Sequence, residues 1–133
     1  MIHPRNYKVN QAWLSTRVND TFLYVAGDPY DMYILVDVAS CYVFGFVFAK
    51  TAEDEGPDID EIDELFNNAW SSKCQFPIEF YVEEDFSPKE EFKTVCQNYD
   101  ITFNVLPKNS LSLIVDEIKE SFEEHFDSRH VTM

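Results

Sequence analysis

The order of hydrophobic and polar residues predicts three strands in the first part of the chain. Residues 20–26 ("DTFLYVA"), 32–38 ("MYILVDV") and 42–49 ("YVFGFVFA") are rich in β-branched and aromatic residues, a composition typical of strands. The sequence "GDPYD" at 27–31 predicts a turn after the first run, and only "ASC" separates the second from the third. The three runs therefore predict an antiparallel meander, and the near-continuous apolar character of the last two predicts burial on both faces.

The hydrophobic spacing changes to that of helices after residue 57. One apolar stripe predicts a helix at about 58–71, with Asp58 and Glu61 in the positions of an N-terminal cap. A second helix should begin after Ser87, which is followed by Pro88 and by Glu90 at the capping-box position.

The rest of the chain adds two strands and a long helix. Residues 76–82 ("FPIEFYV") and 101–106 ("ITFNVL") predict the strands, and an amphipathic stripe predicts a helix at 110–126. The order βββαβαβα predicts an α/β fold with a mixed five-stranded sheet and helices packed on its faces. At 133 residues the chain fits one domain, with an N-terminal arm at 1–12, a core at 20–126 and a frayed tail at 127–133.

This layout and one hairpin resemble a known family. The sequence "YILVDVASCYVFGFVFAKT" at 33–51, with Ala39, Ser40, Cys41 and Tyr42 in the turn, is similar to the second and third strands of the retroviral integrase and transposase core. The order of the later elements follows the same pattern, so the resemblance covers about 20–126 and implies a ribonuclease H-like fold. The chain is also similar to a group of small bacterial domains with a "VxDxxxGxVxG" hairpin.

The resemblance implies carboxylates from the middle of the first strand, the end of the fourth strand and the last helix, which together hold two metal ions. If 20–26 is the first strand, its centre, Leu23–Val25, carries no carboxylate. Acids do end the fourth strand and lie on the last helix, and we expect Glu84, Asp85 and Glu120 to form a residual acidic surface. We therefore expect a degenerate family site without catalytic residues, metal or cofactor.

Asp37 has two interpretations. We expect it to end its strand beside the turn, where its carboxylate would cap backbone N–H groups of "ASC". The alternative is a divalent-metal-dependent nuclease with a rearranged site made of Asp37, Asp85 and Glu120.

The charge of the chain limits the kinds of partner that it is expected to bind. The formal net charge is −15, and residues 1–50 contain four acids and four bases, so the excess lies entirely in 51–133. Acids cluster there at 53–64, 79–91 and 116–127. No run of Lys and Arg offsets them, which disfavours direct binding to nucleic acid and favours a basic protein partner.

Other site chemistry is not indicated by the sequence. The three cysteines lack CxxC spacing and predict reduced thiols, and the three histidines lack metal-ligand spacing. No segment approaches the roughly 20 apolar residues that cross a bilayer, so we expect a cytoplasmic protein.

Three functions follow from these patterns. The leading hypothesis is a non-catalytic ribonuclease H-like domain that acts through protein–protein contacts. The alternatives are an acidic inhibitor or immunity-type protein, whose acids at 53–64 and 116–127 mimic nucleic acid, and the rearranged metal-dependent nuclease.

Overall fold

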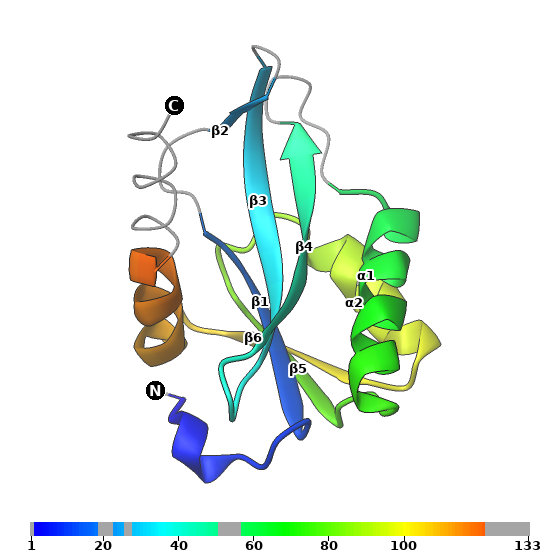
Figure 1. Cartoon of the computed structure of the whole chain (residues 1–133), viewed down its shortest axis with the longest axis vertical. Helices are drawn as coiled ribbons and strands as arrows, with labels where there is room; N and C mark the ends of the chain where they lie inside the picture. Colours follow the sequence, from blue (N-terminus) through cyan, green and yellow to red (C-terminus); the bar gives the residue numbers. More distant parts are fainter. Residues whose placement is uncertain (1, 19–22, 26–27, 51–56, 122–133) are drawn as a thin grey trace.

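A mixed β-sheet with helices on both sides forms the body of the protein (Figure 1). The computed structural model describes residues 2–18, 23–25, 28–50 and 57–121. In chain order the elements are η1 (Pro4–Asn6), β1 (Ala12–Arg17), β2 (Leu23–Val25), β3 (Asp28–Asp37), β4 (Val43–Lys50), α1 (Ile59–Lys73), β5 (Glu79–Glu83), α2 (Lys89–Asn98) and β6 (Thr102–Leu106). Residues 112–121 form a further helix.

Five strands lie side by side in the order β4-β3-β1-β5-β6. Strand β3 is antiparallel to both β1 and β4, whereas β5 is parallel to both β1 and β6. The three-residue strand β2 pairs with the beginning of β3 and brings the number of described strands to six. The predicted five-stranded mixed sheet is therefore present, with one short strand added.

The first strand is not the one that the sequence predicted. Strand β1 lies at 12–17, in the centre of the sheet, and Trp13 and Leu14 are fully buried. The sheet therefore begins before the predicted core start at residue 20, and Ala12 belongs to β1 rather than to the predicted arm at 1–12. The predicted strand at 20–26 is described only at 23–25, where it is the short β2. Of the predicted turn at 27–31, residues 28–31 belong instead to β3, which begins at Asp28, and residue 27 lies outside the described residues.

Two hydrophobic clusters cover the two faces of the sheet. One lies under α1 and α2 and contains Trp13, Phe66, Phe80 and Phe92. The other lies under the helix at 112–121 and includes Leu14 of β1. Figure 1 shows α1 and α2 on one side of the sheet and the helix at 112–121 on the other. Strand β1 contributes side chains to both clusters, which explains why its apolar residues do not alternate with polar ones.

The helix starts confirm one predicted cap and correct the other. The Asp58 carboxylate accepts a hydrogen bond from the Glu61 N–H at 2.9 Å, as predicted. The second helix begins at Lys89, and Pro88 precedes it without a side-chain cap, so Ser87 is not the N-cap. Residues 122–126 of the predicted last helix and the tail at 127–133 lie outside the described residues. Among the helices in the described ranges, none is both long and apolar enough to cross a membrane.

Candidate functional site

The Asp37 carboxylate lies in a closed corner at the end of β3. It is fully buried and accepts hydrogen bonds from the Ser40 N–H at 2.9 Å and from the Ser40 hydroxyl at 2.6 Å. It also accepts a bond from the Asn10 N–H at 2.7 Å. The predicted role of Asp37 as a cap of the "ASC" turn is confirmed.

Asn10 is the residue of this corner that the sequence analysis missed. Its amide oxygen accepts from the Trp13 indole N–H at 2.7 Å, and its amide nitrogen donates to the Gln75 carbonyl at 3.1 Å. Its φ of 65° lies in the left-handed region, which Asn tolerates better than most residues. Asn10 thus joins the lead-in to β1 with the β3–β4 turn and the segment before β5. The only sequence signal was a polar residue of turn-forming type three residues before Trp13.

A polar pocket lies at the opposite end of β1. It lies beside the C-terminal ends of the parallel strands β1 and β5 and has a volume of about 400 Å³. Residues from β1, β3, β5, the loop after β5 and the helix at 112–121 line it: Ser15, Thr16, Arg17, Asp31, Tyr33, Glu83, Asp85, Phe86, Ser87, Val115 and Lys119. Three of these places, β1, the end of β5 and the last helix, are those from which the family resemblance implies metal-binding carboxylates.

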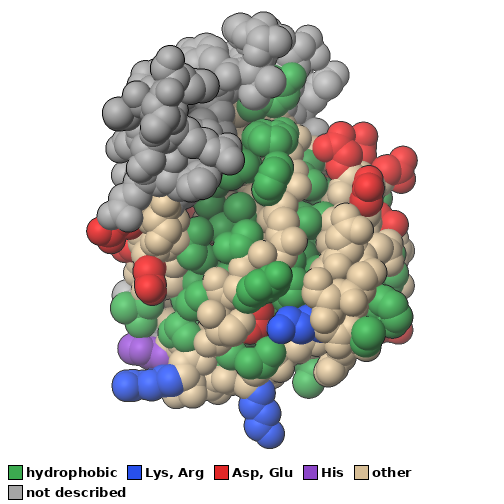
Figure 2. All heavy atoms as spheres, viewed as in Figure 1, with side chains coloured by type: hydrophobic (Ala, Val, Ile, Leu, Met, Phe, Trp, Pro, Cys, Tyr) green, Lys and Arg blue, Asp and Glu red, His purple; other side chains and the backbone are tan. Residues whose placement is uncertain are grey.

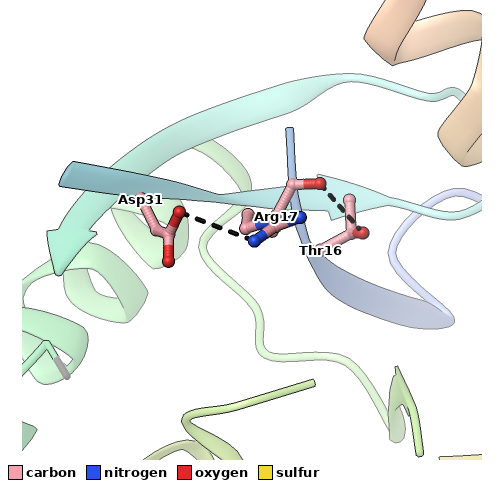
Figure 3. A network of polar contacts seen from close by, with 3 residues as sticks. All are labelled: Thr16, Arg17 and Asp31. Atoms are coloured by element: carbon pink, nitrogen blue, oxygen red, sulfur yellow. Dashed lines mark hydrogen bonds and ion pairs between the residues drawn. The ribbon is translucent and has the colours of Figure 1, made fainter. Parts of the chain in front are cut away.

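Strand β1 supplies a hydroxyl and a guanidinium to this pocket rather than a carboxylate. Ser15 is only 1% exposed, and among the described residues its hydroxyl has no hydrogen-bond partner. Arg17 lies two residues further along the same side of the strand and pairs with the buried Asp31 of β3, with 3.6 Å between the charged atoms. Figure 3 shows Arg17 and Asp31 approaching each other from the two neighbouring strands.

The end of β5 and the last helix add few free carboxylates. Glu83 accepts a hydrogen bond from the Leu111 N–H at 3.0 Å and so holds the start of the last helical segment. Asp85 is exposed and lines the pocket. Glu84 and Glu120 are exposed but do not line it; the helix presents Val115 and Lys119 there instead.

The residues of the pocket do not fit a two-metal carboxylate site. Within the described ranges, no group of three or more His, Cys, Asp or Glu side chains is placed to share a metal ion. Asp37 is buried at one end of β1, whereas Asp85 follows the far end of β5. The arrangement of Asp37, Asp85 and Glu120 is therefore not formed, and the central residues of β1 supply no carboxylate in its place.

Burial raises the pKa of two side chains in the core, Tyr33 and Cys96. Burial, followed by the nearby Asp31 carboxylate, raises the pKa of the Tyr33 phenol, which lines the pocket. Burial also raises the pKa of the Cys96 thiol to about 12. Cys96 thus stays protonated at neutral pH and does not resemble an activated nucleophile.

The acidic clusters do not form one surface in the described part of the chain. The acids that begin α1 lie on the side of the sheet that α1 and α2 cover. Asp116, Glu117 and Glu120 lie on the helix that covers the other side. A surface that combines 53–64 with 116–127 is therefore not formed by the residues described.

Comparison with known proteins supports the fold. No protein-family model matches the sequence, and no curated protein matches it. Among solved structures, the chain is similar to the catalytic core domain of HTLV-2 integrase, so it has the ribonuclease H-like fold of the retroviral integrase core, as the resemblance predicted.

Two of these structures are HTLV-2 integrase core domains in complex with magnesium. The dimeric form is 15% identical over 93% of this chain and 74% of that chain, with a TM-score of 0.62. The trimeric form is 17% identical over 92% and 73%, with a TM-score of 0.61. The simian T-cell lymphotropic virus intasome, in complex with PP2A regulatory subunit B56 gamma, is 15% identical over 90% of this chain and 42% of that one, with a TM-score of 0.56. At these identities the likeness establishes the fold alone.

Proposed function

We propose that this chain is a ribonuclease H-like domain without nuclease activity that acts through protein–protein contacts. The observation that carries the proposal is the set of side chains that line the pocket at the ends of β1 and β5. Ser15 lies in the central strand, where the resemblance implies a carboxylate, and Lys119 faces the pocket from the last helix.

Electrostatics in the pocket supports the same proposal. Two metal ions need several converging carboxylates, because carboxylate oxygens replace part of the water shell of each ion and offset its charge. Here Asp31 is paired with Arg17, and Glu83 is bonded to the Leu111 N–H. The Lys119 ammonium adds a further positive charge, which opposes the binding of divalent cations.

The charge of the chain favours a protein partner over nucleic acid. A net charge of −15 repels a phosphate backbone, whereas it attracts a basic protein surface over a distance set by the salt concentration. The acidic-inhibitor alternative shares this attraction. Because the acidic clusters lie on opposite sides of the sheet, an inhibitor surface would use the cluster of α1 or the cluster of the last helix alone.

A nuclease assay tests the non-catalytic proposal. The purified chain is incubated with supercoiled plasmid and with an RNA–DNA hybrid, in Mg²⁺ and separately in Mn²⁺, and products are separated on gels. We expect no cleavage above that of a mock purification. The proposal fails if cleavage occurs, is abolished by Asp85→Asn or Glu84→Gln, and persists in Glu90→Gln, a matched loss of one exposed acid on α2.

A further inference from the structure

Strand β4 forms an open edge of the sheet. Among the described strands it pairs with β3 alone, so the backbone N–H and C=O groups of its other edge have no strand partner there. Its side chains alternate between two faces: Val47 and Ala49 are buried on the side of α1, whereas Phe46 is 54% and Phe48 is 37% exposed. An open edge with exposed aromatic residues is a template to which another strand can add.

A shallow groove runs between β4 and α1 beside this edge. Its volume is about 340 Å³, and residues 44–48 of β4 line it together with Glu61, Glu64, Leu65 and Asn68 of α1. In Figure 2, hydrophobic side chains gather over β4, and acidic side chains gather over the first turns of α1. Gly45 permits the close approach of the two elements, because a Cβ at this position would lie 2.9 Å from the Leu65 Cδ1 atom.

The α1 side of the groove is negatively charged, and no cation of the described residues neutralises it. Within the described residues, neither the Glu61 nor the Glu64 carboxylate has an ion-pair or hydrogen-bond partner. Burial, and then the neighbouring charges of Asp58 and Glu64, raise the pKa of Glu61. A cationic side chain placed here would gain two carboxylates that no cation of the described chain neutralises.

We propose that β4 and α1 bind an extended segment of a partner protein in which Lys or Arg alternates with apolar residues, added to the sheet as a strand beside β4. This inference rests on the proposed function and names its surface. Successive side chains of a strand point to opposite faces. One set of the added strand would therefore face Glu61 and Glu64, and the other would lie beside Phe46 and Phe48.

The spacing of the two elements fits this pattern. Along a helix axis, residues three apart are separated by roughly 4.5 Å. Alternate residues of a strand are separated by roughly 6.6 Å. Long, flexible Lys or Arg side chains span this difference, so basic residues two apart in the segment can each reach one of the two carboxylates.

A second copy of the chain fits the groove less well. Pairing of two β4 edges would bring two acidic α1 helices, each with Asp60, Glu61, Asp63 and Glu64 near its start, into one assembly. Each copy also carries a net charge of −15. Repulsion between like charges opposes that dimer and favours a basic partner.

Titration with a synthetic peptide tests the proposal. The probe is a ten-residue peptide of alternating Lys and Val, and its control is a block peptide of five Lys followed by five Val. The full chain, labelled with ¹⁵N, is titrated with each peptide at low and at moderate salt, and amide shifts and hydrogen exchange are recorded. We expect shifts at residues 44–48 and 61–68, slower amide exchange along β4, and at least fivefold weaker binding of the block peptide.

Two charge variants locate the binding site. Glu61→Gln with Glu64→Gln should weaken binding of the alternating peptide about five- to tenfold, because two ion pairs with the groove are lost. Asp116→Asn with Glu120→Gln changes the net charge equally but on the other side of the sheet, and it should weaken binding less than twofold. Phe46→Ser, at an exposed position, tests the apolar side of the groove and should also weaken binding.

Three outcomes would overturn the groove as the binding site: no binding of the alternating peptide, equal binding of the block peptide, or shifts centred on the last helix. A dimer that forms through β4 without peptide, detected by analytical ultracentrifugation, would assign the edge to a second copy instead. These failures would not bear on the proposal that the chain lacks nuclease activity, because the cleavage assay reports on the pocket at the ends of β1 and β5.

Discussion

The two ends of β1 place polar side chains in the core in opposite ways. At the N-terminal end, Asp37 is fully buried and surrounded by donors from Asn10 and Ser40. At the C-terminal end, Ser15 is buried beside a polar pocket, and its hydroxyl has no partner among the described residues. A buried carboxylate in the middle of a motif is thus structural when N–H and hydroxyl donors use its oxygens, whereas the polar atom that lacks a partner within the described residues lies beside the open pocket.

Removal of the Asp37 carboxylate should destabilise the protein more than any other change considered below. Asp37→Ala leaves the Asn10 N–H and both donors of Ser40 without their acceptor, which should lower the free energy of unfolding by about 3–5 kcal/mol. Urea denaturation followed by circular dichroism measures this loss. Asp85→Ala, an acid of the opposite end, should change stability by less than about 0.5 kcal/mol. Equal losses in the two variants would remove the distinction between the ends.

Asn10→Ala should produce the next largest loss, about 2–3 kcal/mol. It removes both side-chain bonds of Asn10, leaves the buried Trp13 indole N–H unpaired and places Ala at a positive φ. Asn10→Gly removes the same bonds but tolerates the backbone conformation, so it should cost less than Asn10→Ala. Thermal and urea unfolding of both variants measure the difference; a Gly variant less stable than the Ala variant would refute the backbone contribution.

At the pocket end of β1, removal of a polar side chain should raise rather than lower the free energy of unfolding. Ser15→Ala removes a buried hydroxyl that lacks a hydrogen-bond partner within the described part of the chain, and it should raise the free energy of unfolding by about 0.5–1.5 kcal/mol. Thr16→Ala, at the neighbouring and more exposed position, is the matched control and should be nearly neutral. A clear loss of stability in Ser15→Ala would show that the hydroxyl has a partner that stabilises the fold.

The smallest effect concerns the pH dependence of stability at the same end. The pKa of Tyr33 is raised in the folded state, above its ordinary value of 10.0, so the phenol ionises more readily in the unfolded chain. Its contribution to stability is therefore complete below pH 10 and is lost as the pH rises through the folded-state pKa. Urea titrations between pH 8 and 11 should show that wild type loses stability faster than Tyr33→Phe above pH 10. Parallel curves would indicate that Tyr33 has an ordinary pKa.

The hairpin, the helices and the role of Asp37 could be predicted from the sequence because each has a local signal. The "ASC" turn and the Asp58 cap depend on neighbouring residues only. Strand β1 could not be found in this way, because its burial follows no alternation and its end reads as polar "STR". The pocket was missed for the same reason: its members join through strand pairing, and without β1 the sequence offered no reason to place Ser15 near Lys119.

The central position of β1 has a consequence for synthesis of the chain on the ribosome. Its antiparallel neighbour β3 follows soon after it, but its parallel neighbour β5 is made only at residues 79–83. A nascent chain that ends before β5 therefore exposes one whole edge of its central strand, an edge that neighbouring nascent chains could capture. Strands β5 and β6 complete the sheet on this side of β1. Translation pauses before residue 79 should therefore favour aggregation more than pauses after residue 106.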